Sequence, residues 1–289
     1  MWKDRLNNGL NYSARFTLAD SRTKITRYSN PSGLIDGFYA GKYVGEIWGY
    51  ETIGIAQSDQ EMAEHIGRLI NGGQSNLGQD WKAGDIMYKD LNEDGKIDAG
   101  SHTLQDHGDL KRIGNSTPRY NVGLELAADW KGFDIRMFWQ GTLKRDYFQG
   151  SYYFWGANGR QGPWFSTALK GHDDYFRNDE ASPLGTNLNS YYPRPLFNTD
   201  KNQQSQTKYL QDASYLRLKN LQIGYSLPHN IVQKMGMQHL RIFASGENLF
   251  TITSLIDFFD PESIEGGSWG HGNVYPLSRT FSFGLNVTF

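Results

Sequence analysis

A short acidic segment, residues 90–98, carries oxygen-bearing side chains at every second position. It contains Asp90, Asn92, Asp94 and Asp98, with Gly95 and Lys96 between the last two. The spacing matches positions 1, 3, 5, 6, 7 and 9 of an EF-hand calcium loop, in which alternate oxygens point inward and the glycine permits a sharp turn. The backbone carbonyl of Lys96 would then be the ligand at position 7. The pattern predicts a bound Ca²⁺ that clips the loop structurally.

Position 12 of the pattern departs from this expectation. An EF-hand loop ends on a carboxylate that binds through both oxygens, but Ser101 stands there. In a longer loop, Asp106 or Asp109 could supply the missing carboxylate. The alternative is a polar surface turn that binds no metal, because Asp, Asn and Gly are also the usual residues of turns.

A second group of candidate residues lies in the aperiodic stretch 145–208. Its aromatic residues are Tyr152, Tyr153, Phe154, Trp155, Trp164 and Phe165. Exposed rings can stack on sugars or anchor a partner protein, and Tyr152, Tyr153, Trp155 and Trp164 are the candidates for such contacts. The favoured interpretation is that these rings pack against one another and hold the loop together.

No grouping of residues indicates catalysis. The sequence contains no His-Glu-x-x-His pattern, and a solvated loop accounts for the carboxylate pairs Asp173–Asp174 and Asp179–Glu180. The glycine-rich run 266–270 has no phosphate-binding context. The net charge of −2 gives no basic surface for nucleic acid, and the absence of cysteine excludes disulfides and thiolate ligands. We therefore expect no enzyme and no nucleic-acid partner.

The elements that would position these residues are strands. Residues 281–289 alternate without interruption, so that Phe281, Phe283, Leu285, Val287 and Phe289 share one face. The opposite face carries only small or polar residues. Successive side chains of a strand point to opposite faces. Lipid on the apolar side and water on the other would satisfy both faces in a transmembrane β-barrel.

Further strands of this kind are predicted along the chain. Their ranges are 10–18, 46–56, 84–89, 120–128, 133–140, 215–227 and 240–248. In strand 215–227, Leu216 and Leu218 fall on the opposite face from Leu221 and Leu227. Either a bulge lies near Asn220, or the upper part of this strand stands above the membrane. Ser58, with Glu61 three residues later, predicts the start of a short helix.

The connections between the later strands alternate in length. The links at 130–133 and 228–238 are short, and those at 145–208 and 253–278 are long. Outer-membrane barrels have short periplasmic turns and long extracellular loops, so the alternation favours an all-β, antiparallel barrel with about eight to ten of its strands here. A soluble, surface-exposed glycan-binding β domain is the alternative, because it would also be rich in aromatic residues and glycine.

Several phrases together resemble a known family. They are 84–98, ending in Asp-Leu-Asn-Glu-Asp-Gly-Lys-Ile-Asp; Ile113–Tyr120; Tyr215–Leu221 with Gly224-Tyr225; Gly246–Phe250; and Tyr275–Arg279. In this order they are similar to the C-terminal part of SusC/RagA-type TonB-dependent outer-membrane transporters. The resemblance extends over nearly the whole chain.

The resemblance implies a 22-stranded barrel in the bacterial outer membrane, of which residues 1–289 would be the C-terminal portion. An N-terminal plug and a signal peptide would precede that portion in the full protein. The transporter would import oligosaccharide or peptide fragments with energy delivered through TonB. A SusD-like surface lipoprotein would cover its outer loops. The Gly108-Asp109 pair corresponds to one before the Ile-Gly-Asn motif of the family, which selects Asp109 as the late calcium ligand.

Overall fold

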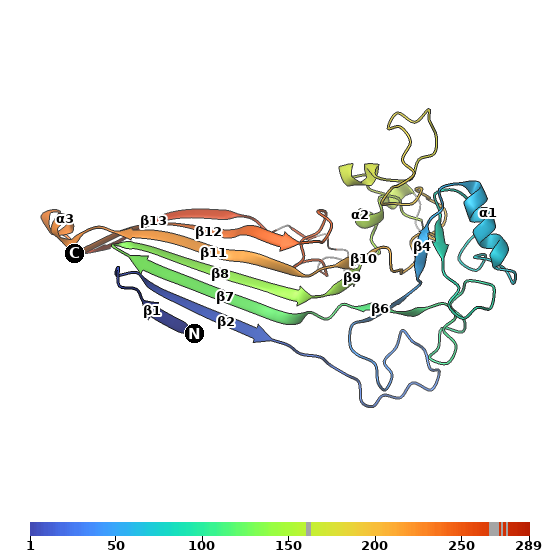
Figure 1. Cartoon of the computed structure of the whole chain (residues 1–289), viewed down its shortest axis with the longest axis horizontal. Coiled ribbons are helices and arrows are strands. Elements are labelled where there is room, and N and C mark those ends of the chain that lie inside the picture. Colours follow the sequence, from blue (N-terminus) through green and yellow to red (C-terminus); the bar gives the residue numbers. More distant parts are fainter. Residues whose placement is uncertain (160–162, 266–271, 273, 276) are drawn as a thin grey trace.

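The computed structural model describes residues 1–159, 163–265, 272, 274–275 and 277–289. A long antiparallel sheet forms one end of the molecule, and a lobe built from the long connections forms the other (Figure 1). We call residues 20–118, 145–214 and the described part of 254–279 the loop lobe. The sheet strands are β1 (Trp2–Arg5), β2 (Asn11–Ala19), β7 (Arg119–Trp130), β8 (Phe133–Lys144), β11 (Tyr215–Ser226), β12 (His239–Thr253) and β13 (Thr280–Thr288).

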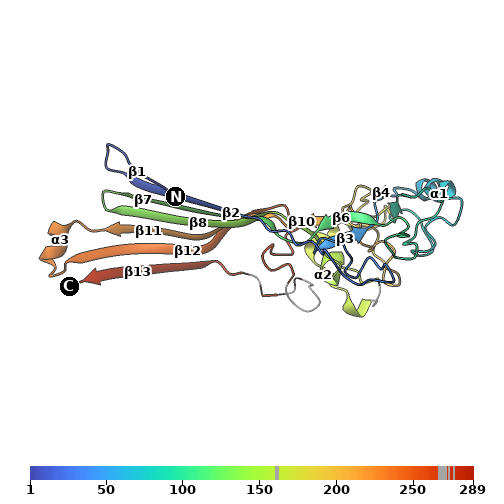
Figure 2. The same ribbon diagram turned by 90° about the horizontal axis from the view of Figure 1, so that it is seen from below.

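The sheet follows the order β1-β2-β7-β8-β11-β12-β13, and every pairing is antiparallel. The antiparallel fold expected from the sequence is confirmed. The sheet is curved and open, with β1 and β13 at its edges (Figure 2). It has seven strands among the described residues, so the expectation of eight to ten was too high. The two other predicted strands, 46–56 and 84–89, form pairs within the loop lobe instead.

The short and long connections lie at opposite ends of the sheet, as predicted. Lys131 and Gly132 link β7 to β8, both with positive φ as a tight hairpin turn requires. Pro228 ends β11, and α3 (His229–Lys234) follows at the same end (Figure 1). The long connections all enter the loop lobe at the other end. Among the described residues, no helix is long and apolar enough to cross a bilayer.

The register of the sheet gathers its apolar side chains on one face. Leu285 of β13 pairs with Ile242, and Phe283 pairs with Ala244; directly paired residues share a face. The row consists of Ala14, Phe16, Leu18, Val122, Leu124, Leu126, Ile135, Met137, Trp139, Leu221, Ile223, Ile242, Ala244, Phe281, Phe283, Leu285 and Val287. We call it the apolar face. Phe283 is 86% exposed and Leu285 64% exposed, so this face is not the inside of a sealed core.

The opposite face of the sheet is mainly polar. Arg241 of β12 donates two hydrogen bonds to the carboxylate of Asp134 of β8, from Nη2 to Oδ1 at 2.6 Å and from Nε to Oδ2 at 2.8 Å. Phe243 is an exception, and its ring lies over Gly284 of β13, where a Cβ would be only 2.3 Å from it. The two faces therefore differ in polarity as the sequence alternation predicts.

The predicted bulge in β11 is present. The register shifts between Leu218 and Asn220 against both β8 and β12. As a result, Leu218 pairs with Trp139 while Leu221 pairs with Met137. Because Trp139 and Met137 lie two residues apart on β8, the extra residue puts Leu218 on the same side of the sheet as Leu221.

The loop lobe contains short ladders and one regular helix. Its paired strands are β3 (Glu46–Gly49) with β6 (Lys111–Asn115), β4 (Thr52–Ile55) with β5 (Ile86–Tyr88), and β9 (Asp146–Phe148) with β10 (Leu210–Asp212). The single strand predicted over 46–56 is therefore two strands with different partners. Helix α1 (Asp59–Arg68) begins as predicted, since Ser58 Oγ accepts from the backbone N–H of Glu61 at 3.1 Å.

The main hydrophobic core lies in the loop lobe rather than under the sheet. Its fully buried members include Ile35, Ile86, Tyr88, Ile97, Phe154, Tyr209 and Ile264. These residues come from stretches far apart in the chain, including α2 (Tyr152–Trp155). The short 3-10 turns η1 (Pro163–Phe165) and η2 (Lys170–Asp173) follow α2. The long connections thus fold into a packed body at one end of the sheet.

Candidate functional site

The predicted calcium loop has the backbone geometry of a tight, oxygen-lined turn. Gly95 has a φ of +80°, which glycine adopts without strain, and its N–H donates to Asp90 Oδ2 at 2.8 Å. Asn92 and Asp94 each accept from the backbone N–H two residues later, at 3.2 and 3.1 Å. Asp90 Oδ1 is buried without a hydrogen-bond partner among the described residues. A buried carboxylate oxygen without a hydrogen-bond partner is suited to bind a cation.

The structure distinguishes the two carboxylates that could close the loop. Asp109 is fully buried, and its oxygens accept from the backbone N–H groups of Leu91 at 2.7 Å and Asp98 at 2.9 Å. Burial, and then the negative charge of Asp90, raise the pKa of Asp109. Asp106 turns away and binds Ser101 instead. The geometry therefore brings Asp109, and not Asp106, back onto the loop.

Two other predicted ligands, Asp94 and Asp98, make contacts that would compete with a metal ion. The ammonium of Lys96 lies 2.5 Å from Asp98 Oδ2 and 3.7 Å from Asp94 Oδ2. Asn76 also donates to Asp98 Oδ2 at 3.3 Å. Within the described ranges, no group of three or more His, Asp or Glu side chains is arranged to hold a metal ion. Asp98 would have to release Lys96 before it could bind Ca²⁺.

The four aromatic candidates lie in different environments. Trp155 is 6% exposed and belongs to the core, with its ring centroid 4.6 Å from that of Tyr209. Tyr152 and Tyr153 are half-buried, and their ring centroids lie 4.4 Å apart. Trp164 in η1 is 88% exposed. Packing within the loop therefore accounts for three of these rings, and Trp164 remains available for contact.

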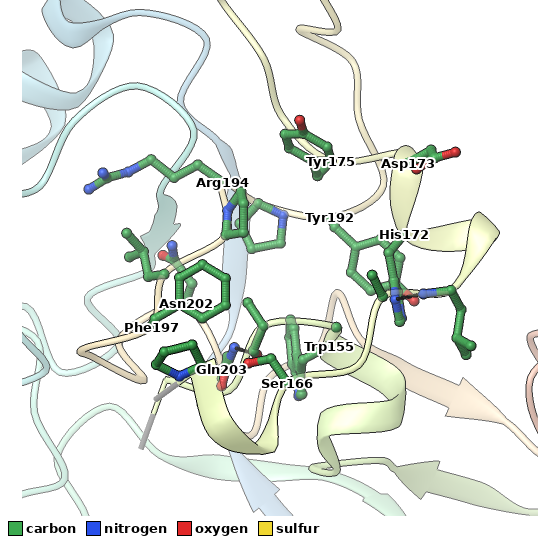
Figure 3. Close-up of a pocket in the computed structure, with 18 of the residues that line it drawn as sticks. Trp155, Ser166, His172, Asp173, Tyr175, Tyr192, Arg194, Phe197, Asn202 and Gln203 are labelled. Atoms are coloured by element: carbon green, nitrogen blue, oxygen red, sulfur yellow. Dashed lines mark hydrogen bonds between the residues drawn. The ribbon is translucent and has the colours of Figure 1, made fainter. Parts of the chain in front are cut away.

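A pocket of about 490 Å³ lies beside Trp155 in the loop lobe (Figure 3). Its aromatic and proline lining includes Trp155, Tyr175, Tyr192, Phe197, Pro193 and Pro195, and its polar lining includes His172, Asn202 and Gln203. Burial lowers the pKa of His172, so the imidazole is neutral at pH 7. Of these lining residues, the sequence indicates only Trp155 as a contact residue, because the others come from loops without periodicity.

A buried ionic cluster beside this pocket was also missed. The carboxylate of Asp85 is fully buried and accepts from Arg194 Nε at 2.7 Å and Nη2 at 2.8 Å. Lys201 Nζ lies 2.8 Å from it, and Asn202 Nδ2 donates at 2.9 Å. Burial acts to raise the pKa of Asp85, but the bonds from these three side chains outweigh it, and the pKa is lowered. Asp85 lies in segment 84–98, and for this residue the sequence indicates only the family resemblance.

The carboxylate pairs considered for catalysis are exposed on the loop lobe. Asp173, Asp174, Asp179 and Glu180 all face solvent, and Asp174 accepts from Asn187 at 2.8 Å. This agrees with the solvated-loop interpretation. The glycine-rich run 266–270 lies outside the described residues.

Comparison with known proteins gives a consistent result. TonB-dependent receptor P3 of Formosa agariphila is 30% identical over 258 residues, which are 86% of this chain and 22% of that receptor. Receptor P26 of the same organism is 26% identical over 71% of the chain and 20% of its own length. No protein-family profile matches.

The chain is a relative of the TonB-dependent receptors. It spans about a fifth of the length of these two curated relatives. This relationship places the protein in the bacterial outer membrane, as the sequence predicts. The relatives are receptors, not enzymes.

Solved structures agree on the fold. The RagAB peptide transporter matches 99% of this chain with a TM-score of 0.65 and 21% identity, over 28% of the matched chain. The RagAB peptide importer in its closed-closed state gives a TM-score of 0.61 and 19% identity. The arrangement of sheet and loop lobe is therefore also found within a longer chain of the RagAB peptide transporter.

Proposed function

We propose that the complete protein imports oligomeric nutrients across the outer membrane with energy delivered through TonB. The observation that carries the proposal is the two-faced sheet. Its apolar face is suited to lipid, its polar face to a water-filled lumen, and the loop lobe occupies one end. The resemblance to TonB-dependent receptors supports this assignment.

The finer assignment is to the SusC/RagA group of these receptors. Residues 1–289 would form the C-terminal part of the 22-stranded barrel, in a longer chain with an N-terminal plug and a signal peptide. A SusD-like lipoprotein would dock on the loop lobe, where Trp164 is exposed. The RagAB likeness supports the group, and the substrates would be peptide or oligosaccharide fragments. No enzymatic activity is proposed.

The acidic loop adds a calcium site to this proposal. Asp90, Asn92, Asp94 and Asp109 would supply side-chain oxygens, and Lys96 its backbone carbonyl. Asp98 would join them after releasing the ammonium of Lys96. Support comes from the loop spacing, the turn at Gly95 and the unpartnered Asp90 Oδ1. The ion would stiffen the loop lobe and take no part in chemistry.

The soluble glycan-binding domain is the less favoured alternative. Such a domain would bury its apolar strand faces between sheets, whereas Phe283 is 86% exposed here.

Uptake in the source bacterium tests the proposed import. A strain lacking the complete gene, a strain lacking TonB and the wild type would each receive defined mixtures of oligopeptides and of oligosaccharides. Import predicts that at least one mixture is consumed only when both genes are present. Equal consumption of every mixture in all three strains would refute it.

A further inference from the structure

The pocket beside Trp155 has the size of a ligand site. Its volume of about 490 Å³ lies within the range of roughly 300–1,000 Å³ that is usual for small-ligand pockets. The rings of Trp155 and Tyr192, with Phe197, stand around one hollow (Figure 3). Apolar surface that is concave, rather than flat, can remove most of a small group from water.

The walls of this pocket are fixed by contacts behind them. The ring centroid of Trp155 lies 4.6 Å from that of Tyr209, and that of His172 lies 5.4 Å from Tyr192 and 4.9 Å from Phe258. His172 also lies 3.0 Å from the carbonyl oxygen of Tyr153. A pocket held in this way is preformed, so little ordering opposes binding.

The two amide side chains of the lining already have partners within the protein, and the hydroxyl of Tyr192 is buried, with no partner among the described residues. Asn202 donates to Asp85 and accepts from the N–H of Ile86, at 2.9 and 3.0 Å. Gln203 donates to the carbonyl of Ala157 at 2.7 Å and accepts from Gly159 at 3.2 Å. A sugar has a hydroxyl on most carbons and would lose hydrogen bonds to water here without replacing them.

The charges near the pocket do not face its centre. The guanidinium of Arg194 is turned outward toward Asp85, and the carboxylate of Asp173 points away from the hollow (Figure 3). A charged group that entered would lose its hydration without gaining a partner. The pocket therefore selects for an uncharged group without many hydroxyls.

We propose that this pocket receives an apolar ring side chain, such as that of phenylalanine, from a peptide substrate. The proposal rests on the proposed import function and names the substrate class within it. Ring-on-ring contacts with Trp155, Tyr192 and Phe197 would hold the side chain. The peptide backbone would remain outside.

Peptide binding to the complete receptor in detergent tests this pocket. The probes are the peptides Ala-Ala-Phe-Ala-Ala and Ala-Ala-Lys-Ala-Ala, and their binding is measured by titration calorimetry. We expect the phenylalanine peptide to bind at least about tenfold more tightly. Ala168→Trp, which fills the pocket from its lining, should weaken binding of that peptide about tenfold or more. Ala181→Trp is the matched control, since Ala181 is exposed on the same long loop outside the lining.

Three results would overturn the proposal. The first is equal binding of the two peptides by the wild type, and the second is equal effects of the two substitutions. The third is binding of maltotetraose that Ala168→Trp abolishes, which would assign the pocket to a glycan. Each of these results can occur while TonB-dependent uptake persists in cells, so failure of this pocket is distinct from failure of the import function.

Discussion

Asp85 joins two stretches of the loop lobe that are far apart in the sequence. Its partner Arg194 is 109 positions away, and Lys201, which is 1% exposed at its side chain, lies on the same distant stretch. A buried carboxylate costs free energy through desolvation, and its paired cations offset that cost. The lining of the pocket beside Trp155 includes Arg194 and Asn202, so this cluster also shapes that pocket.

Replacing Asp85 with asparagine should loosen the loop lobe. The change leaves the buried Lys201 and the partly buried Arg194 without their counter-charge. Breaking a buried pair in this way typically costs about 3–5 kcal/mol. We expect faster proteolysis within residues 79–88 and 194–202 of the complete receptor. Asp80→Asn makes the same chemical change at an exposed position of the same segment and should have little effect. Equal cleavage of both variants would contradict this role.

The same cluster predicts a dependence of lobe stability on pH. Since the folded-state pKa of Asp85 is lowered below the usual 3.8, its contribution is complete above that pH and is lost as pH falls through the lower folded value. Cleavage of the wild type by an acid protease should therefore accelerate as the pH falls below 3.8, and it should accelerate more than cleavage of Asp85→Asn. Identical acid profiles would argue against the cluster.

Calcium binding is a second prediction at the scale of single residues. Asp90→Ala removes the unpartnered buried oxygen at position 1 of the loop and should abolish the heat of Ca²⁺ binding to the complete receptor in detergent. Glu93→Gln removes a charge from an exposed position of the same loop that is not a ligand position, so binding should persist. A wild-type receptor that gives no heat with Ca²⁺, and no protection of residues 90–109 from protease, would remove the site.

At the scale of elements, strands were easier to predict than the lobe. Alternation defined β2, β7, β8, β11 and β13 because each strand has a different environment on its two faces. The bulge at Asn220 was also predictable, because leucines fell on the wrong face without it. The lobe was not predictable, since contacts such as Gln206 with Tyr50 join distant loop residues without any local pattern.

The hairpin turn between β7 and β8 gives a prediction for one element. Gly132 has a φ of +91°, and a Cβ there would lie 2.8 Å from the carbonyl oxygen of Ser226. Gly132→Ala should therefore destabilise the barrel by about 1–3 kcal/mol, through strain and this contact. Gly9 also has a positive φ, +85°, but open space around it. Gly9→Ala should cost less in denaturant unfolding of the complete receptor, and an equal or larger cost would contradict the crowding at Gly132.

At the scale of the whole molecule, the sheet and the loop lobe lie at opposite ends and have different properties. The sheet presents an apolar face and a polar face, and the loop lobe carries the packed core, the acidic loop and the pocket. The sequence predicted the acidic loop because its ligands are close together along the chain. It did not predict the pocket, whose lining comes from residues 155–157 and from residues 163–203, which fold back upon them.

The most direct test of the lipid-facing assignment compares two arginine substitutions on β13. Leu285 lies at mid-strand on the apolar face beside Ile242, and Ser282 lies on the polar face beside Ser245. Folding of the complete receptor into lipid vesicles would be measured by urea titration. The account predicts that Leu285→Arg loses about 2–4 kcal/mol of folding free energy and that Ser282→Arg loses little. Equal losses, or a larger loss for Ser282→Arg, would contradict a lipid-facing apolar surface.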